Sequence, residues 1–167
     1  MKKLAVLAGV IVAAGIAFAG ATAPRAGGTT GPPDQPHGVH ITPLSHTTIG
    51  SKVHVNNAGI KIATRGPRDM LVTSIVVDPG GSFGWHTHPG PVLVAVSKGT
   101  LALYQADEPG CPRSTVTAGQ AFIEDGGDVH LARNEGSDPV ELNAIFLART
   151  GTTEFLTAVP EPRGCHI

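Results

Sequence analysis

Residues 80–99 read GGSFGWHTHPGPVLVAVSKG, and this stretch decides the fold prediction. It contains a His-x-His pair, His86 and His88, followed by alternating valines. In an extended strand, residues two apart project from the same side, so both imidazoles can reach one ion. The pair alone is equally compatible with two histidines in a surface loop, because the chain contains 8 histidines.

The residues around the pair favour a metal site. Trp85 precedes it, and a Pro-Gly-Pro turn at 89–91 follows it as a rigid, partly apolar segment. A third histidine, His130, follows the glycine-rich turn at 125–127 at the start of another apolar run. Three imidazoles from the edges of two strands would form one compact site.

Outward from these histidines, short apolar runs alternate with turn signals. The runs are rich in β-branched residues, which favour strands. They cover residues 52–55, 60–63, 70–77, 92–96, 100–104, 121–124, 129–132 and 140–147. Turns are predicted between nearly all of them, including one at Asp-Pro-Gly-Gly, 78–81. No stretch has a sustained helical period, so the pattern predicts an all-β sandwich or small barrel, with jelly rolls among the options.

Length and composition agree with this prediction. A chain of 167 residues with 41% hydrophobic content is sufficient for one domain with a core. Its 22 glycines and 14 prolines, with 4% aromatic residues, favour short strands joined by tight turns. Lys and Arg number 12 against 13 Asp and Glu, and no basic run occurs, so we expect no nucleic-acid partner.

The histidine segments resemble the two motifs of the cupin superfamily. Those motifs are Gly, five residues, His-x-His, three or four residues, Glu, six residues, Gly; and Gly, five residues, Pro-x-Gly, two residues, His, three residues, Asn. The positions that match are Gly80, His86, His88 and Gly99 in the first motif and Gly119, Gly127, His130 and Asn134 in the second. Two positions differ, since Val92 replaces the Glu and Asp125 replaces the Pro. The strings GWHTHPGP and HLARNEG also resemble those of small, single-domain type-2 cupins of actinobacteria.

The resemblance implies a single-domain cupin jelly-roll β-barrel in which His86, His88 and His130 hold one divalent transition metal. Val92 cannot coordinate a metal, so the site is expected to resemble the three-His centres of some cupin dioxygenases. Three neutral imidazoles would leave the divalent charge uncompensated and favour an anionic ligand. Imidazole ligands suit Fe, Zn, Ni and Cu, and the sequence does not distinguish these metals or Mn.

Two acidic residues lie beside the second motif. Glu124 and Asp125 are candidates for substitute ligands or for acceptors of an imidazole N–H from outside the ligand set. The alternative, which we favour, is that both are solvated acids of a turn.

The N-terminal segment has the features of a secretory signal. Lys2 and Lys3 precede an apolar stretch that ends in Ala-x-Ala sites, so residues 1–23 are expected to be a signal peptide. The stretch is also long enough for a retained membrane anchor, which is the alternative. Residues 24–37 are expected to form a flexible leader, and residues 38–167 the barrel domain. The protein is then expected to be secreted or held in the cell envelope.

The chain contains 2 cysteines, Cys111 and Cys165, in polar segments rich in Pro and Gly. Export would favour a disulfide that ties a loop to the C-terminal tail. Two free thiols are the alternative, but no base lies near either of them in the sequence. We predict that the two cysteines are paired.

Two classes of function follow. The first is an exported metal-dependent enzyme, a dioxygenase with a three-His centre that oxidises a small organic substrate. The second is a module that binds a metal or a small ligand without turnover, since no paired carboxylates or general base are evident. In both cases we expect a small-molecule ligand as the partner, and a homodimer is a candidate assembly.

Overall fold

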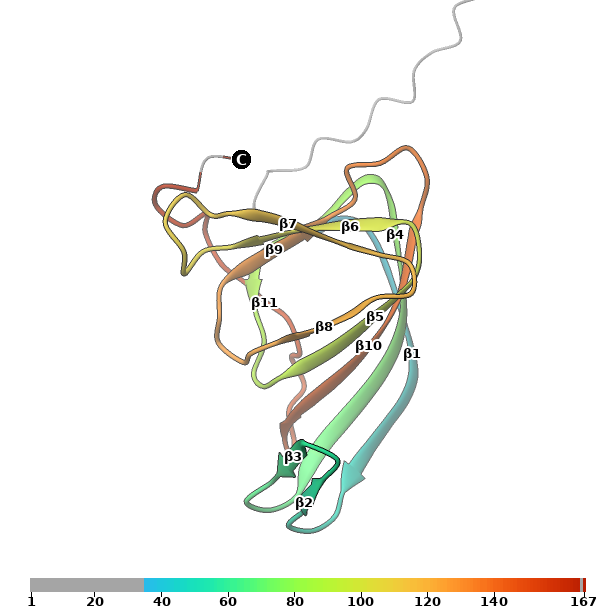
Figure 1. Ribbon diagram of the computed structural model, residues 1–167, viewed down its shortest axis with the longest axis vertical. Helices are drawn as coiled ribbons and strands as arrows, with labels where there is room; N and C mark the ends of the chain where they lie inside the picture. The colour runs from blue at the N-terminus through green and yellow to red at the C-terminus, as the bar shows by residue number, and fades with distance from the viewer. Residues whose placement is uncertain (1–34, 166) are drawn as a thin grey trace, which may run out of the picture.

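Antiparallel strands form the regular structure of residues 35–165 and 167, the part of the chain that the computed structural model describes (Figure 1). The strands are β1 (His37–Ile49), β2 (His54–Asn57), β3 (Ile60–Ala63), β4 (Arg68–Thr87), β5 (Val92–Lys98), β6 (Thr100–Gln105), β7 (Arg113–Thr117), β8 (Ala121–Glu124), β9 (His130–Arg133), β10 (Val140–Arg149) and β11 (Thr157–Ala158). No helix occurs within these residues. The all-β prediction is therefore confirmed.

One long strand joins the two layers of a jelly-roll barrel. The strand order is β7-β6-β9-β4-β10-β5-β8, with β1 and β11 also paired to β4, while β2 and β3 form a separate hairpin. The first half of β4 pairs with β1 and β10, and its last residues pair with β9 and β11. In Figure 1, β6, β7 and β9 lie in the upper layer, and β5, β8 and β10 lie below them. The end of β4 therefore brings its histidines beside β9.

The turn predicted at 78–81 is wrong, because β4 continues through these residues for 20 residues in all. Gly80 has a φ of 75° and the register of β4 shifts between Ser82 and Trp85, so the strand bends without ending. A glycine tolerates this backbone conformation without steric strain. Sequence analysis counted Gly80 as a turn residue, whereas here it lets one strand change its neighbours.

Strands β1, β7 and β11 were not predicted. Strand β1 starts at His37, one residue before the predicted start of the domain, and most of its 13 residues are exposed or half-buried. It therefore lacks the clear alternation that marks a strand with one buried face. Strand β7 is mostly exposed, and β11 has only 2 residues. These strands are stabilised by their neighbours more than by a local sequence pattern.

The main core lies between the layers. In β5, buried Val92, Val94 and Val96 alternate with exposed Leu93 and Ala95. The buried valines pack with side chains of the other strands, including Ile75, Val77, Leu101, Leu142 and Phe146. Burial of such side chains stabilises a fold by roughly 1.5 to 3 kcal/mol each. The alternation in β5 orients the residues that face the barrel interior.

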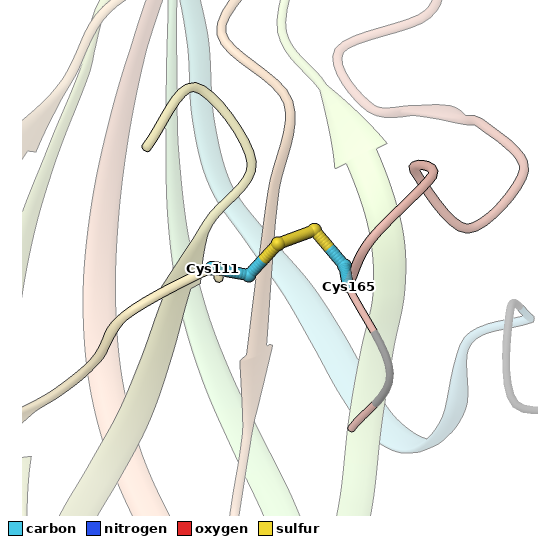
Figure 2. Close-up of a disulfide and its surroundings, with 2 residues drawn as sticks. All are labelled: Cys111 and Cys165. Carbon is cyan, nitrogen blue, oxygen red and sulfur yellow. A yellow bond between two sulfur atoms is a disulfide. The ribbon is translucent and has the colours of Figure 1, made fainter. Parts of the chain in front are cut away.

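A second core, on the outer side of β9 and the end of β4, surrounds a disulfide. Cys111 and Cys165 are joined, with their Cα atoms 5.4 Å apart, and they pack with Trp85, Tyr104 and Leu131. Figure 2 shows the bond linking the loop before β7 to the end of the chain. The predicted disulfide is confirmed.

The predicted signal peptide, 1–23, and nearly all of the predicted leader, 24–37, lie outside the described residues. Within the described part of the chain, no helix has the length and apolar character needed to cross a membrane.

Candidate metal centre

Three histidines meet inside the barrel. His86 on β4 lies directly opposite His130 on β9, and His88 follows two residues later on the same face. Their side chains are buried, with exposed fractions of 2%, 5% and 1% for His86, His88 and His130. One nitrogen from each ring lies within 4.8 Å of the others. The structure thus brings together the three residues that sequence analysis selected.

Backbone carbonyls fix the orientation of all three rings. Each Nδ1 lies close to a carbonyl oxygen: 2.9 Å for His86 and Gly84, 2.6 Å for His88 and Phe155, and 3.0 Å for His130 and Asp128. A carbonyl oxygen only accepts, so each Nδ1 carries the hydrogen and donates it. The Nε2 lone pairs therefore remain free for a ligand. The Nε2 atom of His130 is buried without any hydrogen-bond partner in the structure.

Two glycines hold the two motif turns in contact. A Cβ on Gly126 would lie 2.6 Å from the Cα of Gly90, and a Cβ on Gly90 would lie 2.0 Å from the carbonyl oxygen of Leu147. In addition, the N–H of Gly127 donates to the carbonyl of His88 at 2.9 Å. The turn after His88 is thereby fixed against the turn before His130. Residues with side chains do not fit at either glycine without a backbone shift.

A carboxylate also faces the histidines. Glu124 ends β8, and its oxygens lie 3.3 Å from Nε2 of His88 and 3.1 Å from Nε2 of His130. The Glu124 side chain is only 9% exposed, so its interpretation as a solvated turn acid is wrong. Asp125, the next residue, is exposed, as that interpretation expects. Strand β8 ends at Glu124, and Asp125 is the first residue of the connection to β9, which separates the two acids.

The site contains the carboxylate of Glu124, and among the described residues no Lys or Arg forms an ion pair with it. Burial alone raises the pKa of Glu124, but His130 and His88, when they carry a second proton, outweigh burial and lower it to about 2. Burial, together with neighbouring His130, lowers the pKa of His86 to about 3. Burial alone would lower the pKa of His130, but Glu124 outweighs it and the pKa is raised. Both ion-pair partners of Glu124 among the described residues are histidines.

The site borders an apolar cavity. The cavity has a volume of about 90 Å³, and its polar lining comprises His86, His88, Glu124 and Thr73. The rest of the lining is aliphatic or aromatic and includes Val92, which occupies the position of the cupin glutamate. The cavity is well below the roughly 300 to 1,000 Å³ typical of pockets for drug-sized ligands. Only a small molecule fits.

A C-terminal strap, residues 150–158, completes the site. Phe155 and Leu156 line the cavity, and the Phe155 carbonyl accepts the hydrogen bond from His88. Strand β11 in this strap pairs with Thr87 and His86 of β4. Sequence analysis missed the strap because its contribution to His88 comes from a backbone carbonyl, which any residue possesses.

The donor set fits a divalent transition metal. Three imidazole nitrogens converge with their hydrogens directed away, which is the arrangement of histidine ligands held by carbonyl acceptors. The partnerless Nε2 atom of His130 is a buried acceptor that a bound cation would satisfy. The residues present are therefore chemically suited to such an ion.

One family model and several solved structures are similar to this chain. The cupin domain family model matches residues 73–146, which include both histidine motifs. The structure of peruvianin-I, a cysteine peptidase from Thevetia peruviana latex, is similar with a TM-score of 0.50 and 21% identity over 73% of this chain and 67% of that one. The polyketide cyclase RemF from Streptomyces resistomycificus has a TM-score of 0.47 and 19% identity, over 57% of this chain and 63% of the cyclase.

A DMSP lyase structure, from a study of RdDddP and RnDddQII, has a TM-score of 0.46 and 20% identity over 55% of this chain. The match spans only 44% of the lyase chain. No curated protein matches in sequence. The structural likenesses concern the fold, and the family match rests on residues that carry the histidines. By the family model over residues 73–146, the motifs and the barrel, this chain contains a cupin domain.

Proposed function

We propose that this protein is a metal-dependent cupin in which His86, His88 and His130 hold one divalent metal beside a cavity for a small organic molecule. The observation that carries the proposal is the convergence of three Nε2 atoms whose Nδ1 hydrogens are all donated to backbone carbonyls. This arrangement leaves three lone pairs in a buried space bordered by an apolar cavity.

The cavity supports a narrow class of ligand. Its lining is almost entirely apolar apart from the histidines, Glu124 and Thr73, so most of the ligand surface must be apolar. One polar group of the ligand would point toward the histidines, because burying an unpaired polar group elsewhere is costly. A bound divalent metal would supply a Lewis acid, or iron would supply oxygen chemistry. The apolar walls would exclude water from the reacting group.

We infer an oxygenase of small apolar substrates as the activity. A binding module without turnover is the second candidate, and one observation favours it. The titratable residues in the cavity lining are His86, His88 and Glu124, all of which belong to the candidate metal centre. No separate general base therefore faces a ligand from the described lining.

Metal analysis tests the proposed metal site, and oxygen consumption tests the proposed oxygenase activity. Purified protein should contain about one transition metal ion per chain, and His86→Ala with His130→Ala should abolish it. His54→Ala, on the exposed hairpin strand β2, is the matched control and should retain the metal. Oxygen uptake by the iron-loaded protein with diketones, thiols or flavonoids supports an oxygenase. Metal content that is unchanged in the double variant would refute the proposed site.

We also propose that the protein is exported and that residues 1–23 are removed. The Cys111–Cys165 disulfide supports this, because disulfides persist mainly in oxidising compartments. Mass spectrometry of protein from the native host should show a mature chain that lacks at least the first 19 residues, since an Ala-x-Ala site ends there. An intact Met1 on cytoplasmic protein would contradict export.

A further inference from the structure

We propose that Glu124 is the fourth protein ligand of the metal, so that the carboxylate missing at position 92 reaches the ion from the neighbouring strand. This inference rests on the proposed function, because it assumes a metal held by the three histidines. It assigns a ligand role to Glu124, a position to which neither histidine motif assigns a ligand.

Strand pairing gives the first argument. Val92 of β5 lies directly opposite Glu124 of β8 in the antiparallel register. Directly opposite residues of paired strands project from the same face, with Cβ atoms about 4.5 to 5.5 Å apart. Val92 is buried and lines the cavity, so Glu124 must also point inward. A side chain at position 92 and a side chain at position 124 therefore both project toward the histidines from the same face of the β5–β8 pair.

Distances give the second argument. Oε2 of Glu124 lies 3.3 Å from Nε2 of His88, and Oε1 lies 3.1 Å from Nε2 of His130, so each histidine faces a different oxygen of the carboxylate. These nitrogens carry lone pairs because their Nδ1 atoms carry the hydrogens, and a carboxylate offers lone pairs only. Two acceptors at this separation repel each other unless a cation lies between them. Ligand atoms about 2.0 to 2.2 Å from one ion are roughly 2.8 to 3.6 Å apart, which matches both distances.

Burial gives the third argument. A carboxylate with 9% exposure needs a compensating charge, because burying an unpaired charge costs several kcal/mol. The competing explanation is a proton, which would make His130 or His88 an imidazolium paired with Glu124. A metal satisfies more of the site, because it also provides a partner for the Nε2 atom of His86.

The inference changes the expected ligand class. Three neutral imidazoles leave two positive charges on the centre, whereas one carboxylate ligand leaves a single positive charge. Anionic ligands are then attracted less strongly than in a three-His site. The expectation of an uncompensated divalent charge is therefore replaced by a centre better suited to a neutral or singly charged group.

Three variants test the inference through metal affinity, measured by competition with a chromophoric chelator. Glu124→Val should weaken binding by at least on the order of 10- to 100-fold, the cost typical of losing even a residue that only hydrogen-bonds to a metal ligand. Glu124→Gln keeps the size of the side chain and should weaken binding less. The double variant Val92→Glu with Glu124→Val moves the carboxylate back across the strand pair and should recover most of the affinity. Asp125→Asn, on the exposed neighbour, is the matched control and should bind like the wild type.

The visible spectrum of the cobalt(II)-substituted protein provides a readout independent of activity. It should change in Glu124→Val and return toward the wild-type spectrum in the double variant. Wild-type affinity and spectrum in Glu124→Val would overturn the inference while leaving the three-His site intact. Failure of the wild type to bind any transition metal would instead refute the proposed function. Circular dichroism and an intact disulfide would establish that each variant is folded.

Discussion

Two glutamates of this barrel have equally low pKa values for different reasons. Glu124, inside the barrel, contacts His88 and His130. Glu135, outside it, accepts hydrogen bonds from Tyr104, Arg113 and Arg133 at 2.5, 2.9 and 2.7 Å. Burial alone raises the pKa of each; hydrogen bonds outweigh burial at Glu135, and protonated His130 and His88 outweigh it at Glu124, so that both pKa values are lowered to about 2.

The difference lies in the partners. The guanidinium groups around Glu135 are charged at every physiological pH, so that carboxylate is fully paired by the protein itself. Imidazoles are neutral unless they take up a proton, so the carboxylate of Glu124 is paired only when His130 or His88 is protonated or, as we propose, when a metal ion binds. The outer cluster is complete as it stands, whereas the inner cluster is the proposed metal centre. The same low pKa therefore marks a structural ion pair in one region and a candidate binding site in the other.

The largest expected effect concerns the outer region. Replacing both cysteines by serine should lower the free energy of unfolding by about 4 kcal/mol, because the disulfide closes a large loop in the unfolded chain. The two cysteines are 54 residues apart in the sequence. Urea unfolding of the oxidised wild type and the double variant measures this. Equal stabilities would show that the outer region does not depend on the bond.

The next effect concerns the inner region. A metal at about 100 times its dissociation constant should stabilise the wild type by about 2.7 kcal/mol through mass action. The variant Glu135→Gln should gain the same increment, since Glu135 lies in the outer cluster. His86→Ala with His130→Ala should gain none. Calorimetric melting with metal and with chelator measures all three, and a smaller increment in Glu135→Gln would show that the two regions are coupled.

The contact between the two motif turns should also be sensitive. Gly126→Ala places a Cβ against the backbone of Gly90 and should cost about 1 to 3 kcal/mol, as overpacking does. Gly66→Ala is the matched control, because a Cβ there meets nothing within 4 Å. Denaturant unfolding measures both. A loss of metal affinity in Gly126→Ala, in addition to lost stability, would show that the turn sets the geometry of the histidines.

The smallest effect is that of Glu135 itself. Its pKa is lowered in the folded state, so the stability it contributes is present above the unfolded value near 4.5 and is lost as pH falls toward about 2. Glu135→Gln should cost on the order of 1 kcal/mol at neutral pH. It should also flatten the acid side of the stability profile. Urea midpoints from pH 2 to 7 measure this, and parallel profiles would contradict it.

The histidines were predictable from the sequence because their geometry is local. His86 and His88 share a face through the period of a strand, and a glycine-rich turn before His130 marks the start of a second strand. The position of Glu124 depends on the register between β5 and β8, which local sequence does not encode. Because Glu124 lies next to a turn in the sequence, the sequence favoured a side chain exposed to solvent.

The wrongly predicted turn at 78–81 and the unpredicted strand β1 also result from pairing between strands that are distant in the sequence. The Asp-Pro-Gly-Gly segment at 78–81 has the composition of a turn, but pairing with β1 and β10 before it and β9 after it extends the strand on both sides. Strand β1 has no buried face of its own and follows β4 through backbone hydrogen bonds. Sequence patterns indicate burial well, and they indicate pairing between distant segments poorly.

The C-terminal strap has a consequence for the order in which the molecule is assembled. His88 lies near the middle of the chain, yet its Nδ1 hydrogen is accepted by residue 155. The carbonyl acceptors of His86 and His130, by contrast, lie only two residues before them in the sequence. The third ring acquires its orientation only when the strap docks along β4, close to where the disulfide then fastens the end of the chain. Alignment of all three rings therefore requires the C-terminal strap as well as the two histidine motifs.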